Sequence, residues 1–147
     1  MNLLVKILFC TAECDPFVKI GGLGDVSRAL PQALSKLAVD VRVVLPLYDV
    51  IPRDRFALEK MQTFTFSYAD NQEEVTVWQT TLPGTSVITL LFENEKYLSC
   101  GGEEAFSGLD DEIRRFAFFD RAVVHWLASQ EHWHPDILHL NDWHLGL

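Results

Sequence analysis

The hydrophobic pattern begins with a strand, a helix and a second strand. Residues 4–9 form a nearly continuous apolar run, typical of a strand covered on both faces of a parallel sheet. From Leu23 the period changes to three- and four-residue steps, which predicts a helix with one buried face. The predicted buried stripe is Val26, Leu30, Ala33, Leu34 and Leu37. Residues 41–45 give the next apolar strand, so the first 46 residues predict a right-handed βαβ unit.

Pro31 lies inside the predicted helix. Proline removes one backbone donor and disturbs the preceding turn, so either the helix bends at Pro31 or its boundary lies elsewhere.

The middle of the chain predicts a β-hairpin and a further strand. Residues 63–68 and 74–80 alternate between polar and apolar side chains, and the turn-forming run 69–72 separates them. Residues 86–92 add another strand. Residues 97–111 carry glycines and acids without a period, which predicts a mobile loop.

A second helix is expected over residues 111–129, with Asp110 or Asp111 as its N-cap. Its residues Phe116, Phe118 and Phe119 are assigned to the core rather than to a cofactor site. Residues 137–140 predict a short buried strand. The sequence ends at Leu147, where another helix should begin, so we expect a fragment of a longer protein. The predicted fold class is α/β, a mostly parallel doubly wound sheet with a hairpin insertion.

Composition narrows the classes of function. The chain has 147 residues, a net charge of −9 and 48% hydrophobic residues, enough to bury a core without disulfides. A pI near 4.9 argues against nucleic acid or an anionic membrane as partner. The first apolar run is too short to span a bilayer and has no leader-type cleavage site. Three cysteines without paired spacing predict reduced thiols and a cytoplasmic location.

The first candidate site is the glycine-rich run between the first strand and the first helix. Glycines allow a ligand to approach the backbone, and a helix N-terminus favours phosphate, to which Lys19 would add a positive charge. Asp25 would repel phosphate and is therefore expected to bind a neutral sugar hydroxyl. The run fits neither the dinucleotide fingerprint nor a Walker loop, and a simple strand-to-helix turn remains the alternative.

The second candidate site follows the last strand. Its members are His139, Asn141, Asp142, Trp143 and His144, which supply carboxylate, imidazole and indole groups suited to sugar. Zinc is the rival interpretation because histidines are dense here, but their spacing fits no standard zinc pattern. No D-x-D pair occurs, which argues against a magnesium-bridged diphosphate.

Both runs resemble signatures of bacterial glycogen synthases and plant starch synthases. The first is Lys19-Ile20-Gly21-Gly22-Leu23-Gly24-Asp25-Val26, preceded by Thr11-Ala12-Glu13 and followed by Ala29-Leu30-Pro31 and Val43-Val44-Leu45-Pro46. The second is Asp136-Ile137-Leu138-His139-Leu140-Asn141-Asp142-Trp143-His144. The resemblance covers essentially the whole chain, but only the front portion of such an enzyme.

The resemblance implies a GT-B enzyme of two facing Rossmann-like domains. Such an enzyme transfers glucose from ADP-glucose to the non-reducing end of an α-1,4-glucan with retention, and needs no metal or cofactor. Residues 1–147 would be its truncated N-terminal, acceptor-side domain, inactive alone without the nucleotide-binding domain. The implied donor contacts are Lys19, Gly21, Gly22 and Asp25; Asn141, Asp142, Trp143 and His144 would line the cleft, with Asp25, Asp142 and His144 as catalytic residues.

Two departures and two alternatives accompany this hypothesis. Ile20 stands where the family usually has Thr, and the stretch 97–111 is shorter than the family's insertion. The alternatives are a transferase for another sugar nucleotide and a non-catalytic glucan-binding module. Homo-oligomerisation is left open, and a plastid location would apply only to a plant protein.

Overall fold

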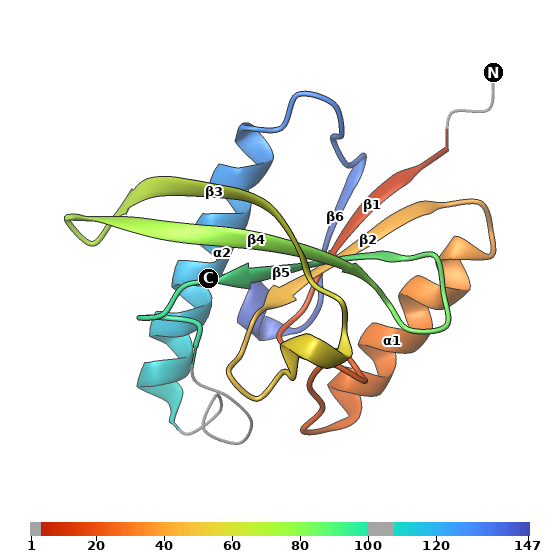
Figure 1. The fold of residues 1–147 in the computed structure, drawn as a ribbon, viewed down its shortest axis with the longest axis horizontal. Helices are drawn as coiled ribbons and strands as arrows, with labels where there is room; N and C mark the ends of the chain where they lie inside the picture. Colours follow the sequence, from red (N-terminus) through yellow and green to blue (C-terminus); the bar gives the residue numbers. More distant parts are fainter. Residues whose placement is uncertain (1–3, 100–107) are drawn as a thin grey trace.

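Residues 4–99 and 108–147 are described by the computed structural model, which forms one mixed sheet flanked by two long helices (Figure 1). In chain order the elements are β1 (Lys6–Cys10), α1 (Gly22–Ser35), β2 (Asp40–Pro46), η1 (Arg53–Arg55), β3 (Glu59–Tyr68), β4 (Asn71–Thr81), β5 (Ile88–Glu93), α2 (Leu109–Ala128), β6 (Ile137–Leu140) and η3 (Trp143–Leu145).

The sheet has six strands in the order β3-β4-β5-β2-β1-β6. Strands β5, β2, β1 and β6 are parallel, whereas β4 pairs antiparallel with both β3 and β5. The long β3–β4 hairpin extends one side of the parallel strands (Figure 1). The predicted α/β sheet with a hairpin insertion is confirmed.

The central strands β1, β2 and β5 are covered on both faces, as a doubly wound fold requires. Alternate residues of β1 enter different cores: Leu8 and Cys10 pack with the aromatic residues of α2, whereas Ile7 and Phe9 belong to the cluster that packs against α1. Phe116, Phe118 and Phe119 are fully buried in the first core, which confirms their assignment.

Helix α1 continues through Pro31. Proline at position 31 cannot donate to the carbonyl of Ser27, four residues earlier. The thiol of Cys14 donates to that carbonyl instead, with a sulfur–oxygen distance of 3.4 Å. The side chain of another loop therefore replaces the missing backbone donor.

The predicted buried stripe of α1 is partly wrong. Val26 and Leu37 are 50% and 74% exposed, and Ala33 is also exposed. The buried positions are Gly24, Ser27 and Pro31, flanked by the partly buried Leu30 and Leu34. Leu30 and Leu34 pack against the core beside these small residues, whereas Val26 and Ala33 face solvent.

Three further boundaries differ from the predictions. The N-cap of α2 is Gly108, and Asp110 and Asp111 lie in the first helical turn, where acidic side chains favour the helix dipole. The predicted loop thus ends before residue 109, and its part 100–107 lies outside the described residues. The hairpin turn is tighter than predicted, since Ala69 and Asp70 alone adopt positive φ between the strands.

Strand β6 is not buried as predicted. It lies at the edge of the sheet beyond β1, and Ile137, Leu138 and Leu140 are 48%, 41% and 48% exposed. The apolar residues of this short segment predict that a strand is buried, but they do not identify the element that packs on it.

Candidate functional site

The two candidate runs meet at one edge of the sheet. Strands β1 and β6 are parallel neighbours with Cys10 opposite Leu140, so the loops that follow them leave the sheet together. The backbone N–H of Asn141 extends this pairing by donating to the carbonyl of Cys10 at 3.0 Å. Neighbouring parallel strands thus join sequence motifs that are more than a hundred residues apart.

A short relay of hydrogen bonds ties the second run to the first. The side-chain amide of Asn141 donates to Ser27 Oγ at 3.0 Å, and Ser27 Oγ lies 2.7 Å from Thr11 Oγ1. Thr11 Oγ1 in turn donates to the carbonyl of Glu13 at 2.9 Å. Thr11 and Ser27 are fully buried, so these bonds are shielded from water. Asn141 therefore bridges the runs with the amide that we predicted to bind substrate.

The glycine-rich loop has one closed and one open side. Glu13 Oε2 accepts bonds from the N–H groups of Ile20 and Gly21. A Cβ at Gly24 would lie 3.2 Å from that oxygen, whereas a Cβ at Gly21 or Gly22 would meet no atom within 4 Å. The open side over Gly21 and Gly22 has room for a ligand that approaches the backbone.

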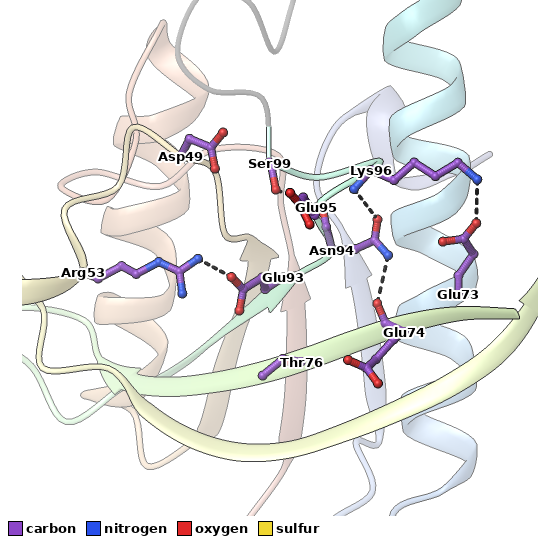
Figure 2. Close-up of a pocket in the computed structure, with 10 residues that line it drawn as sticks. All are labelled: Asp49, Arg53, Glu73, Glu74, Thr76, Glu93, Asn94, Glu95, Lys96 and Ser99. Carbon is purple, nitrogen blue, oxygen red and sulfur yellow. Dashed lines mark hydrogen bonds and ion pairs between the residues drawn. The ribbon is translucent and has the colours of Figure 1, made fainter.

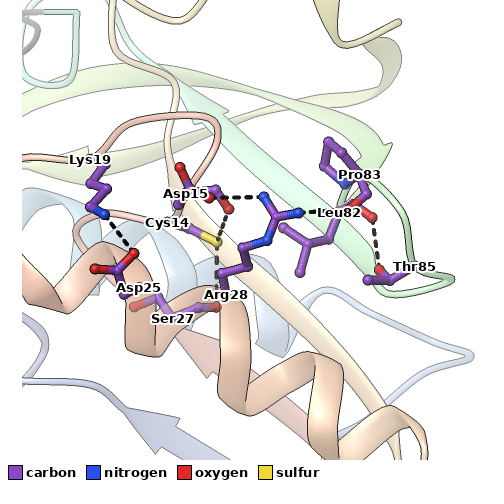
Figure 3. A network of polar contacts seen from close by, with 9 residues as sticks. All are labelled: Cys14, Asp15, Lys19, Asp25, Ser27, Arg28, Leu82, Pro83 and Thr85. Atoms are coloured by element: carbon purple, nitrogen blue, oxygen red, sulfur yellow. Dashed lines mark hydrogen bonds and ion pairs between the residues drawn. The ribbon is translucent and has the colours of Figure 1, made fainter.

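Lys19 and Asp25 form an ion pair on this loop, with 2.6 Å between Nζ and Oδ1 (Figure 3). The hydrogen bond to Asp25 raises the pKa of Lys19, so the ammonium is charged at neutral pH. Both side chains are about half exposed. The residue predicted to bind phosphate and the residue predicted to bind sugar are therefore partners of each other in this structure.

A second ion pair fixes the beginning of the loop. Arg28 on α1 donates to Asp15 Oδ2 at 2.9 Å and to the carbonyl of Pro83 at 3.4 Å (Figure 3). The loop after β1 is thereby connected both to α1 and to the β4–β5 turn.

Asp142 has an unusual backbone conformation. Its φ of 74° and ψ of 170° lie in a region that is populated almost only by glycine. Its carboxylate accepts a 2.7 Å bond from the N–H of Trp143 and caps η3. Trp143 is 44% exposed beside it. Strained non-glycine residues cluster at functional sites, so this conformation supports the choice of Asp142 as a site residue.

His144 lies behind this surface. It is 6% exposed, its ring stacks on Trp143 with centroids 4.1 Å apart, and it meets the edge of Phe116. Its Nε2 lies 4.0 Å from a carboxylate oxygen of Glu112 on α2. Burial lowers the pKa of His144, and neighbouring carboxylates partly offset that effect. In this arrangement His144 supports Trp143, and its predicted catalytic role stays a prediction.

A polar cavity of about 590 Å³ lies beyond the end of β5, on the same sheet edge (Figure 2). No sequence motif pointed to this cavity. Arg53 pairs there with Glu93, and Lys96 pairs with Glu73 at 2.7 Å. Asp49, Glu74 and Glu95 also line it. Both cations are thus neutralised, which disfavours a phosphate there.

The described residues include neither a metal-ligand cluster nor a membrane-spanning helix. No group of three or more His, Cys, Asp or Glu side chains within them is arranged to hold a metal ion. None of the helices within the same ranges is long and apolar enough to cross a bilayer.

Residues 6–147 match the family model of the starch synthase catalytic domain. The chain belongs to this family. It is 39% identical to a glycogen synthase from Clostridium beijerinckii over 97% of its length, and 40% identical to one from Clostridium perfringens over 98%. Each alignment covers 29% of the relative, so the chain spans under a third of the glycogen synthases that it matches.

A solved structure of the starch synthase family has the same fold. The catalytic domain of starch synthase IV from Arabidopsis thaliana, bound to ADP and acarbose, superimposes with a TM-score of 0.79 at 29% identity. The match covers 97% of this chain and 28% of that one. The predicted family and fold are confirmed.

Two residues that hold the candidate site together, Glu13 and Ser27, were not predicted as site residues from the sequence. Glu13 was quoted only as part of the motif, and Ser27 was not singled out. No local pattern marks either residue, because their partners at Ile20, Gly21 and Asn141 are brought to them by the fold.

Proposed function

We propose that this chain is the acceptor-side domain of a glycosyltransferase that moves glucose from ADP-glucose to the non-reducing end of an α-1,4-glucan. One observation carries the proposal. The relay through Asn141, Ser27 and Thr11 joins a loop suited to diphosphate to a turn suited to carbohydrate. The named relatives and the ADP and acarbose in the starch synthase structure support the same pair of ligands.

In this proposal the donor diphosphate lies over Gly21 and Gly22. The free N–H groups of the first turn of α1 and the ammonium of Lys19 stabilise the negative charge that develops on the leaving ADP. The bond from glucosyl C1 to the diphosphate breaks, a bond from C1 to the acceptor 4-oxygen forms, and the acceptor proton leaves with ADP.

The carbohydrate is held by the other groups of the site. When phosphate takes Lys19, Asp25 is released from its ion pair and accepts bonds from sugar hydroxyls. Asp142 and the exposed ring of Trp143 contact the glucosyl and acceptor groups. The sugar contacts assigned to Asp25, Asp142 and Trp143 need no metal or cofactor. A cytoplasmic location would suit a soluble nucleotide-sugar donor.

The test uses the full-length protein that contains this chain. It is incubated with glycogen and radiolabelled ADP-glucose or UDP-glucose, and label in the polymer is counted. We expect transfer from ADP-glucose in preference to UDP-glucose, into linkages that α-amylase cleaves. Equal or greater transfer from UDP-glucose would reassign the donor, and glucan binding without turnover would favour a binding module. Residues 1–147 alone are expected to release no ADP.

A further inference from the structure

Glu13 is a carboxylate buried beneath the glycine-rich loop. It is 5% exposed and lies three residues beyond β1. Its Oε2 accepts bonds from the backbone N–H groups of Ile20 at 2.6 Å and Gly21 at 3.1 Å. Burying a carboxylate is costly unless donors satisfy it, and bonds to a charged acceptor are stronger than neutral ones. These two bonds therefore hold the inner side of the loop.

The fit around Glu13 is close on the helix side as well. A Cβ at Gly24 would lie 3.2 Å from Glu13 Oε2 and 3.1 Å from Lys19 Cγ. Any side chain at position 24 would press on the carboxylate and on the lysine stem together. Glu13, Gly24 and Lys19 thus form one packed unit.

We propose that Glu13 is a positioning residue for the donor diphosphate. It acts through the backbone of Ile20 and Gly21, and it keeps Lys19 and the first turn of α1 facing the open side of the loop. Since Oε2 already occupies the N–H groups of Ile20 and Gly21, the diphosphate binds the N–H groups from Gly22 onward. This inference rests on the proposed function, because it assumes a diphosphate at the loop.

The test compares Glu13→Ala with Glu13→Gln in the full-length protein. The glutamine oxygen can accept the same two bonds, whereas alanine accepts none. Steady-state kinetics give KM for ADP-glucose and kcat, and hydrogen exchange without substrate follows the peptide that spans residues 16–24. Glu13→Ala should raise KM about tenfold or more, the loss expected for a bond to a charged group, and should speed exchange in this peptide. Glu13→Gln should stay within about threefold on both measures.

Glu73→Ala is the matched control, because Glu73 is also a buried carboxylate but pairs with Lys96 away from the loop. It should change neither measure. Gly24→Ala serves as a second variant if Glu13→Ala does not fold, and it should raise KM while the carboxylate remains present.

Two results would overturn the inference. One is unchanged KM and loop exchange in both Glu13→Ala and Gly24→Ala. The other is an equal change in KM and in loop exchange for Glu13→Gln and Glu13→Ala, which would assign the effect to charge rather than to hydrogen bonding. Loop exchange is measured without donor, so it tests Glu13 even if the wild-type protein transfers no glucose from ADP-glucose, the result that would refute the proposed function.

Discussion

The side-chain amide of Asn141 donates to Ser27 Oγ at 3.0 Å across a sequence separation of 114 residues. Asn141 follows β6 and Ser27 lies on the buried face of α1. This bond therefore fixes the turn that carries Asp142 against the helix that carries Asp25. The relative position of the proposed donor and acceptor groups depends on it.

Ser27→Ala should lower the free energy of unfolding by about 1–3 kcal/mol, because it leaves the half-buried amide of Asn141 and the buried hydroxyl of Thr11 without this partner. Urea denaturation measures the change. Thr63→Ala is the control, since Thr63 makes an exposed hydroxyl contact with Thr76, and it should change the free energy by less than about 0.5 kcal/mol. Strictly additive effects of Ser27→Ala and Asn141→Ala would contradict a shared bond.

Lys19→Ala should weaken ADP binding in the full-length protein by about tenfold or more, because it removes a side-chain cation that is predicted to contact the diphosphate. Calorimetry with ADP measures it. The free energy of unfolding should stay nearly unchanged, since the exposed ion pair between Lys19 and Asp25 contributes little to stability. Lys36→Ala, at the opposite end of α1, should bind ADP as the wild type does. Unchanged affinity in Lys19→Ala would remove the lysine from the donor site.

The free energy of unfolding of Asp142→Gly should equal or exceed that of the wild type. Glycine relieves a conformation that costs a non-glycine residue about 1–3 kcal/mol, and this gain offsets the lost η3 cap. Asp142→Ala loses the cap and keeps the strain, so it should be less stable than both. Thermal or urea unfolding ranks the three proteins. Asp142→Ala as stable as Asp142→Gly would mean that no strain is present.

Cys14 and Pro31 should be energetically coupled. Burial raises the pKa of Cys14 to about 12, so its thiol keeps the proton that it donates to the Ser27 carbonyl. Cys14→Ala should lower the free energy of unfolding of the wild type by about 1 kcal/mol. It should lower that of the Pro31→Ala variant by less, because Pro31→Ala restores the helical N–H donor. A double-mutant cycle by urea denaturation measures the coupling. An equal cost in both backgrounds would show that the thiol does not replace that donor.

Asp120→Asn should change how stability depends on pH. Burial raises the pKa of Asp120 from 3.8 to about 6, while a bond from the Leu147 N–H partly opposes the shift. The folded chain then holds this proton more tightly than the unfolded chain, so the contribution of Asp120 to stability falls as pH rises from about 4 to about 6. The stability of Asp120→Asn relative to wild type should therefore increase over this range and then level off.

Urea denaturation from pH 4 to pH 8 measures that difference for Asp120→Asn. Asp70→Asn, in the exposed hairpin turn, is the control and should show a nearly constant difference from wild type. A constant difference for Asp120→Asn as well would mean that its carboxyl titrates alike in the folded and unfolded chain.

The order and type of the elements were determined by the sequence, because the periods of helix and strand are local properties of the chain. The apolar run of residues 4–9, the alternation before and after the 69–72 turn, and the helical pattern expected over residues 111–129 each predicted its element. The two candidate motifs follow β1 and β6 in the chain, as their sequence positions predicted, while their role as a binding site stays a prediction.

The hydrogen-bond and ion-pair partners of the site residues were decided only by the tertiary structure, because these contacts join groups that are far apart in the chain. The neighbouring positions of β1 and β6 brought Asn141 to Ser27, and the folded loop paired Lys19 with Asp25 and placed Glu13 beneath Gly21. The same long-range packing buried His144 and left β6 at an exposed edge. A hydrophobic period predicts which face is covered, whereas only the assembled sheet determines which residue covers it.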